Sequence, residues 1–444
     1  MKKIVVFAVL ALMAAADRAI AERTPGLERD KFHIACFSFN PPAQKREHMR
    51  QARECGLDFV CGGIYVESCP EIRAFEEEGL DFSGIMLPRV CGGGKESDDL
   101  RRKYPRKHLE KMLDDFNARC STPAVRLMNI CDEPGVCSME FLGEVVRLVD
   151  SKCPHTRAHV NLFPNYASVS ENSASAKKSQ LGTSSYKAYI EEYCRLVPTT
   201  FISFDHYPIF KTPERTREFA PRWYGNLKVV ADACRRTGRD LWVGTQVNSR
   251  PKCPPLTENN LRYQAFSAMA FGAVELTWAC WTLGWWDNNL METNGTLTCQ
   301  YPKLKKVNAE IRALADRYME FRNVATHFIG FEGEKKALAK YEISPVGRLS
   351  ASGVTDLAAE GSSLVVGEMA PRGEGDAARA FFVFGAGDCG DERRSSHKVT
   401  FGASGKVLAF SPAGAVPVEE SAPGRFSFDI VDNAAVLVVV NRSM

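Results

Sequence analysis

The feature that most constrains the fold of this chain is a series of eight short apolar runs, separated by stretches with helical periodicity. An apolar run of this length is typical of a strand that is buried on both faces of a sheet. Strands that alternate with helices predict a parallel sheet. The runs cover residues 33–40, 57–65, 80–87, 125–131, 158–163, 201–206, 241–246 and 273–282, and the helical stretches include 138–152, 186–197, 223–236 and 261–272.

Eight strand–helix units over roughly 300 residues match the length of a (β/α)8 barrel, or TIM barrel, whose functional groups lie at the C-terminal strand ends. A doubly wound open sheet shows the same alternation. Such a sheet usually carries a glycine-rich turn after its first strand, whereas this chain has Phe37-Ser38-Phe39-Asn40-Pro41-Pro42 there. The sequence therefore predicts an α/β protein whose first domain, residues 22–322, is a TIM barrel.

The pattern changes after about Arg322. Helical periodicity gives way to short alternating runs, which are separated by Gly, Pro, Asp and Ser. Such strands and turns are typical of an antiparallel β-sandwich. We expect residues 323–444 to form a C-terminal β-sandwich domain beside the barrel, with a buried last strand. The runs cover residues 380–384, 398–401, 406–410, 425–430 and 434–440.

The N-terminus has the three zones of a signal peptide. Met1-Lys2-Lys3 is basic, residues 4–16 are apolar, and Ala19-Ile20-Ala21 supplies small residues. We expect residues 1–21 to be removed and the protein to be secreted or periplasmic. The alternative, an uncleaved anchor helix, is disfavoured because the apolar zone is short. No later stretch has the length of a membrane span, so we expect none in the mature chain.

Composition excludes several classes of function. The net charge is +3 and no basic block occurs, so nucleic acid is not an expected partner. The chain has 15 cysteines, but Cys36, Cys61, Cys131 and Cys280 lie in predicted core strands, which favours buried thiols over disulfides. No cysteine pair has zinc-ligand spacing and the eight histidines are scattered. We therefore expect neither a metal nor a cofactor.

An acidic pair closes the fourth apolar run, in Ile130-Cys131-Asp132-Glu133-Pro134. In this respect the chain resembles the clan A glycoside hydrolases, (β/α)8 glycosidases that place an acid/base glutamate after strand four, often as Asn-Glu-Pro. The resemblance covers about residues 30–322, and a β-domain is a common companion in that clan. It implies a glycoside hydrolase (O-glycosyl hydrolase) that cleaves an oligo- or polysaccharide, with Glu133 as proton donor.

Chemistry supports the same role for Glu133. Glycosidic cleavage needs an acid to protonate the leaving oxygen, and a second carboxylate to act as nucleophile or to activate water. Glu133 suits the first task if burial and a neighbouring charge raise its pKa, and Asp132 is adjacent. The structural alternative is that Asp132 or Glu133 caps the following helix, although Ser138 is the better N-cap residue.

The second carboxylate is not where the resemblance places it. Clan members carry a nucleophilic glutamate after strand seven, but here residues 241–246 end in Gln246, an amide that cannot attack. Three explanations remain: the strand count is displaced, another carboxylate acts, or hydrolysis has been lost and sugar binding kept. We favour the second, with Asp205 ahead of Glu275 and Asp287. The rival hypothesis is a non-hydrolytic carbohydrate-binding protein on a degenerate barrel.

Further side chains near strand ends are candidates for sugar contacts. Pyranose rings pack on aromatic faces, so tryptophans at a barrel mouth suit a sugar subsite. Trp278 lies within a strand and is better explained by core packing. Asn165 and Tyr166, near the end of strand five, are candidates to bond sugar hydroxyls. The expected substrate-binding residues are Asp132, Asn129, Asn161, His206, Tyr207, Gln246, Trp281, Trp285 and Trp286.

Overall fold

The structure is a computed structural model of the 444-residue chain. It describes residues 31–40, 44–62, 69–84, 90–91, 96–120, 122–169, 179–373, 378–390 and 394–441. The predicted signal peptide, residues 1–21, lies outside these ranges. None of the helices in the described ranges combines the length and the apolar character that a membrane span requires.

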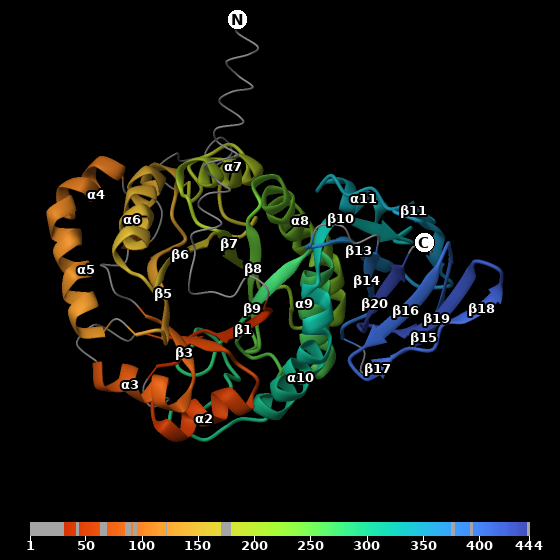
Figure 1. Cartoon of the computed structure of the whole chain (residues 1–444), viewed down its shortest axis with the longest axis horizontal. Helices are drawn as coiled ribbons and strands as arrows, with labels where there is room; N and C mark the ends of the chain where they lie inside the picture. Colours follow the sequence, from red (N-terminus) through yellow and green to blue (C-terminus); the bar gives the residue numbers. More distant parts are fainter. Residues whose placement is uncertain are drawn as a thin grey trace, which may run out of the picture.

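Eight parallel strands close into a TIM barrel, as predicted (Figure 1). Neighbouring strands pair in the order β3-β2-β1-β9-β8-β7-β6-β5, and a β3–β5 pairing closes the ring. The short strand β4 (Val90–Cys91) pairs with the end of β5. The barrel strands are β1 (His33–Cys36), β2 (Phe59–Cys61), β3 (Asp81–Gly84), β5 (Val125–Asp132), β6 (Arg157–Leu162), β7 (Phe201–Asp205), β8 (Asp240–Gln246) and β9 (Ala273–Ala279).

Helices surround the barrel, and the four helical stretches predicted from periodicity are present. They are α2 (Arg46–Glu54), α3 (Cys69–Glu78), α4 (Ser97–Lys103), α5 (Arg106–Cys120), α6 (Met139–Lys152), α7 (Tyr186–Leu196), α8 (Pro213–Thr237), α9 (Glu258–Ala270) and α10 (Gln300–Met319). Local signals fix several ends. Helix α8 begins after the N-cap residue Thr212, with a proline in its first turn, and ends at Gly238, which has a left-handed backbone conformation. Helix α9 begins with a capping box formed by Thr257 and Asn260.

Helix α6 is the first α-helix after the acidic pair, and its start differs from the expectation in one detail. Ser138 occupies its N-cap position, but the Ser138 hydroxyl donates to the Gly135 carbonyl. The N–H of Phe141 instead donates to Ser97 Oγ, 3.2 Å away on α4. The Ser138 side chain therefore makes no N-cap hydrogen bond to α6.

The C-terminal domain is an antiparallel sandwich of a six-stranded and a five-stranded sheet, as predicted. The first sheet has the order β10-β13-β14-β20-β16-β17 and the second the order β11-β12-β15-β19-β18. The elements are β10 (Phe321–Ile329), α11 (Lys335–Ala339), β11 (Leu349–Ala351), β12 (Val354–Ala359), β13 (Leu364–Pro371), β14 (Arg379–Gly385), β15 (Ser396–Ala403), β16 (Lys406–Ser411), β17 (Gly414–Ala415), β18 (Glu419–Ala422), β19 (Arg425–Val431) and β20 (Ala435–Asn441).

The six-stranded sheet is covered on both faces, because α9 of the barrel packs against β13 and β14 (Figure 1). Side chains of β14 alternate accordingly: Phe382 and Phe384 join the barrel core, whereas Phe381 and Val383 face the second sheet. Burial of each such side chain contributes about 1.5–3 kcal/mol. The expected burial of the last strand, β20, is confirmed by the same alternation along it.

Candidate active site

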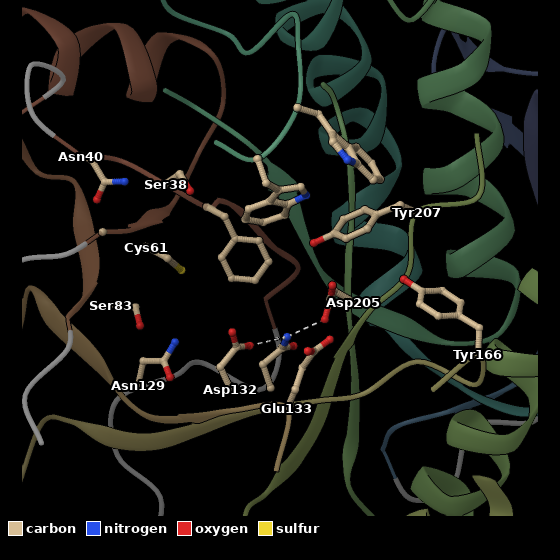
Figure 2. A pocket seen from close by; sticks show the side chains of 15 residues that line it. Ser38, Asn40, Cys61, Ser83, Asn129, Asp132, Glu133, Tyr166, Asp205 and Tyr207 are labelled. Carbon is tan, nitrogen blue, oxygen red and sulfur yellow. Dashed lines mark hydrogen bonds between the residues drawn. The ribbon is translucent and has the colours of Figure 1, made fainter. Parts of the chain in front are cut away.

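A cavity of about 480 Å³ lies at the C-terminal ends of the barrel strands (Figure 2). Its volume falls in the range of small-molecule sites, roughly 300–1,000 Å³. Strand ends and the loops that follow them supply the walls, as is usual for a TIM barrel. The lining residues are Phe37, Ser38, Asn40, Cys61, Gly62, Ser83, Asn129, Asp132, Glu133, Asn161, Tyr166, Asp205, Tyr207, Trp285 and Trp286.

The cavity brings together most of the residues that the sequence analysis selected. Asp132, Glu133 and Asp205 line it from the ends of two different strands, β5 and β7. Figure 2 shows these three side chains across the cavity from Ser38, Asn40 and Cys61. The other predicted residues that line it are Asn129, Asn161, Tyr166, Tyr207, Trp285 and Trp286.

Three predicted binding residues do not line the cavity. The Gln246 amide accepts from Ile209 N at 2.9 Å and donates to the Asn248 carbonyl, so it holds two loops together. The His206 ring bonds Asn226 Oδ1 at 3.0 Å, and burial lowers its pKa to about 4, so it is neutral at physiological pH. Trp281 is 0% exposed and packs on Phe39. The structure gives these three side chains roles in packing and loop anchoring.

Glu133 is held in an uncommon backbone conformation. Its φ is 53°, in the left-handed region that non-glycine residues rarely adopt. The Glu133 N–H donates to the Asn161 carbonyl on β6 at 2.8 Å, which fixes the turn at the end of β5. Such a conformation costs on the order of 1 kcal/mol, and outliers of this kind gather at functional sites. The turn places Glu133 on the cavity wall next to Asp132.

Asp205 is a buried carboxylate that shares a hydrogen-bond donor with a second one, Asp132. Asn161 Nδ2 donates to Asp205 Oδ1 at 2.7 Å and to Asp132 Oδ1 at 3.2 Å. Burial raises the pKa of Asp205 to about 6, and the negative charge of Asp132 adds to the effect, while hydrogen bonds from Tyr207 and Asn161 oppose it. A carboxyl group that titrates near the working pH is suited to proton transfer or to pH-gated nucleophilic attack.

Aromatic side chains form another wall of the cavity, which adjoins Asp205. Tyr207 contacts both Trp285 and Trp286, with ring centroids 5.7 and 5.2 Å apart. Arg250 stacks on the Trp286 ring at 4.5 Å and donates to the Tyr207 carbonyl, which holds the wall in place. Trp285 is 46% exposed, so part of its surface is open to solvent at the cavity mouth. This wall offers flat apolar surface to a ligand.

The sequence analysis missed the part of the cavity formed by the first three strands. Ser38, Cys61 and Ser83 line this side. Nearby, Asn129 Oδ1 is buried and accepts no hydrogen bond from any described residue, and Ser83 Oγ is buried beside the Cys61 thiol. Unmet hydrogen bonds of this kind cost about 1–3 kcal/mol each and favour a polar ligand. Their position at C-terminal strand ends was the available signal.

Two other acidic candidates lie elsewhere. Glu275 is 1% exposed inside the barrel, where Thr277 donates a hydrogen bond to it, and burial raises its pKa to about 8. The Asp287 carboxylate accepts from the Lys252 N–H at 2.9 Å and so fixes a loop. Neither lines the cavity.

Cysteine side chains are described at twelve positions, and each is a thiol rather than half of a disulfide. Cys36, Cys61, Cys131 and Cys280 are buried, as predicted.

Gly244 makes room for Asp205, which predicts a sensitive position. The two residues are paired in register on β8 and β7, and a Cβ at Gly244 would lie 2.9 Å from Asp205 Cβ. Gly244→Ala is therefore expected to displace the Asp205 side chain, at a stability cost of about 1–3 kcal/mol. Gly333→Ala, which meets nothing within 4 Å, is the control for thermal unfolding. Unchanged stability of Gly244→Ala would show that the contact between β7 and β8 has room for a methyl group.

Within the described ranges, no three His, Cys, Asp or Glu side chains are arranged to hold a metal ion. Three ionisable acids, hydroxyl-binding groups and an aromatic wall are combined in one cavity.

The sequence matches no protein-family model, and it matches no curated protein sequence. Solved structures are similar to the chain. The α-L-fucosidase isoenzyme 2 from Paenibacillus thiaminolyticus is 8% identical, with a TM-score of 0.46 over 93% of this chain and 100% of that one. The endo-beta-1,4-mannanase from Thermotoga petrophila is 10% identical, with a TM-score of 0.44 over 90% and 97%. A GH30 endoxylanase from Clostridium papyrosolvens is 10% identical, with a TM-score of 0.42 over 93% and 97%. Likenesses at this level assign no activity and no residue role.

Proposed function

We propose that the protein is a glycoside hydrolase that cleaves O-glycosidic bonds of an oligo- or polysaccharide in the barrel cavity. The observation that carries the proposal is the joint presence of Asp132, Glu133 and Asp205 in one cavity with Trp285 and Trp286. Carboxylates supply acid, base and nucleophile for glycosidic cleavage, and aromatic rings bind the apolar faces of sugars. Polar groups such as Asn129 are available to bind sugar hydroxyls.

In this proposal Glu133 is the general acid/base and Asp205 is the second carboxylate. Glu133 protonates the leaving oxygen, and Asp205 in its ionised form attacks the anomeric carbon or activates water. The two residues come from the ends of β5 and β7, and both act electrostatically on Tyr166, so they face the same part of the cavity. An acid from one strand end and a base from another is the arrangement that both mechanisms of glycoside hydrolysis need.

A panel of aryl glycosides assayed with wild type and Glu133→Gln tests the proposal. We expect wild-type turnover on at least one glycoside, and a loss of about 10²–10⁴-fold in the variant. The loss should be smallest for dinitrophenyl glycosides, since a good leaving group needs little protonation. Glu140→Gln, an exposed carboxylate on α6, is the matched control. Equal activity of Glu133→Gln and wild type on every leaving group would remove Glu133 from the acid role.

A carbohydrate-binding protein without hydrolytic activity is the second candidate. Gln246 favours it, because an amide stands at the end of the seventh barrel strand and is engaged by the backbone. The same panel separates the two functions. A binding protein gives saturable sugar binding by calorimetry and no turnover in wild type or in Glu133→Gln.

The cellular location belongs to the proposal as well. We place a cleavable signal peptide at residues 1–21, the barrel at 22–322 and the sandwich at 323–444, in a secreted or periplasmic protein that acts on external carbohydrate. The sequence pattern of residues 1–21 supports the export step. An N-terminus at Glu22 in protein recovered from outside the cytoplasm is the expected result.

A further inference from the structure

A chain of polar side chains leads from the barrel core to the cavity. His159 Nε2 on β6 lies 3.0 Å from Ser203 Oγ on β7, and Ser203 Oγ donates to Asn161 Oδ1 at 3.1 Å. A serine hydroxyl has a single proton, and here Asn161 receives it. His159 therefore donates from Nε2 to Ser203. This series of hydrogen bonds ends at the Asn161 carboxamide. It fixes the amide so that Oδ1 faces Ser203 and Nδ2 faces the two carboxylates.

The Asn161 carboxamide is fully engaged by protein groups. Its two N–H groups donate to Asp205 Oδ1 at 2.7 Å and to Asp132 Oδ1 at 3.2 Å, and its oxygen accepts a hydrogen bond from Ser203. The two carboxylate oxygens are thus at most about 5.9 Å apart, the sum of the two hydrogen-bond distances. One amide group holds both carboxylates, and little bonding capacity is left for a sugar.

We propose that Asn161 is a positioning residue that clamps Asp132 and Asp205 into one coupled carboxylate pair, and that Ser203 and His159 fix its orientation. The inference rests on the proposed function and deepens it. The role of Asp132 is to control the charge of Asp205. Asn161, which the sequence suggested as a sugar ligand, instead holds the two carboxylates together.

The barrel architecture makes the clamp rigid. Asp132 is paired in register with Asn161, and Asn161 with Ser203, so the three side chains are neighbours across β5, β6 and β7. Below them, the His159 ring lies about 6 Å from both Phe201 and Trp242, which stack on each other at 3.7 Å. A layer of packed rings thus supports the imidazole that starts the hydrogen-bonded chain.

Among the side chains that act on Asp205, Asp132 is a carboxylate that raises its pKa. Tyr207, Tyr166, Tyr186 and Cys280 also face Asp205, from the following loop, the β6 loop, α7 and the end of β9. Burial raises the pKa of each of these groups, so they are uncharged at neutral pH. Asp132 carries a negative charge and shares a hydrogen-bond donor with Asp205. Removal of that charge should change the titration of Asp205.

Carbon-13 NMR of protein labelled at the aspartate carboxyl carbons tests the clamp directly. The Asp205 signal is assigned by its absence in Asp205→Asn. We expect Asp132→Asn, which keeps size and hydrogen-bond acceptor, to move the Asp205 midpoint down by about 1 pH unit. Asn161→Ala should move it up, because the carboxylate loses a hydrogen bond that favours its charged form. An unmoved midpoint in Asp132→Asn overturns the coupling.

A second pair of variants tests the supporting chain. Ser203→Ala should move the Asp205 midpoint in the direction of Asn161→Ala and lower kcat more than it changes KM, and Ser203→Thr, which restores a hydroxyl, should return both. Glu275→Gln, a buried carboxyl group outside the clamp, is the control that should leave Asp205 unchanged. If Ser203→Ala behaves like this control, Ser203 and His159 do not position Asn161. Thermal unfolding of each variant shows that it is folded.

Failure of the clamp and failure of the proposed function give different results. The NMR titration needs no turnover, so it reports on the pair even if no aryl glycoside is cleaved. With turnover, the acidic limb of the kcat/KM profile should follow the Asp205 midpoint in every variant. Turnover in wild type together with an unmoved acidic limb in Asp132→Asn overturns the clamp and leaves the glycosidase proposal standing.

Discussion

Replacement of Asp205 by asparagine is expected to remove turnover and, at the same time, to stabilise the folded protein at neutral pH. The loss of activity should be about 10⁴-fold or more, the usual result of removing a catalytic nucleophile. Stabilisation follows because the native state holds a buried carboxyl group whose pKa of about 6 exceeds its ordinary value of 3.8. The folded state binds this proton more tightly, so stability falls as pH rises from 3.8 to 6. At pH 7 the variant should gain roughly 1–3 kcal/mol.

Two measurements check the Asp205 prediction together. Urea unfolding of wild type and Asp205→Asn at pH 4 and pH 7 gives the stability difference, which should be small at pH 4 and largest at pH 7. In wild type, kcat/KM should rise with pH through about 6, as the Asp205 carboxylate forms. Asp240→Asn, at the opposite end of the next strand, is the matched control. A stable Asp205→Asn variant with full turnover would exclude Asp205 from catalysis and leave Asp132 as the remaining partner of Glu133.

The sequence predicted the barrel because the fold repeats one local unit. Each of the eight apolar runs has a counterpart in β1–β3 and β5–β9, and the periodicity of residues 186–197 corresponds to α7. The same rule places Asp132, Glu133 and Asp205 at strand ends on one face of the barrel, and all three line the cavity. These predictions need only strand order, since parallel strands bring their C-terminal ends to one face.

Side-chain direction within that face could not be predicted in the same way. Gln246 lies at a strand end, but its side-chain oxygen accepts a hydrogen bond from the Ile209 N–H on the loop that follows β7. Trp281 follows a strand end too, but Phe39 and Tyr301 enclose its ring. Those partners come from distant segments, so no local pattern shows them. Ser83 was missed for the opposite reason, because a single serine on a short strand carries no signal until the barrel closes around it.

The second large effect is expected at Glu275, away from the cavity. This side chain is buried inside the barrel, and burial raises its pKa from 4.5 to about 8. An acid whose pKa is higher in the folded state destabilises the fold increasingly as pH rises from about 4.5 to 8. Glu275→Gln removes the ionisable group and keeps an acceptor for the Thr277 hydroxyl. The variant should therefore match or fall slightly below wild type at pH 5 and exceed it by about 3 kcal/mol at pH 7.

Urea unfolding of both proteins between pH 5 and pH 8 checks this prediction, and the two stability curves should separate as pH rises. Glu76→Gln, an exposed glutamate on α3, is the control and should follow wild type throughout. Parallel curves for Glu275→Gln and wild type would show that Glu275 titrates like an exposed glutamate, by access of water to the barrel interior. Separation of the curves instead means that wild-type Glu275 carries a proton at neutral pH. In that state Glu275 is neutral and adds no negative charge near Asp132 and Asp205. The electrostatics of the cavity then depend on the residues that line it.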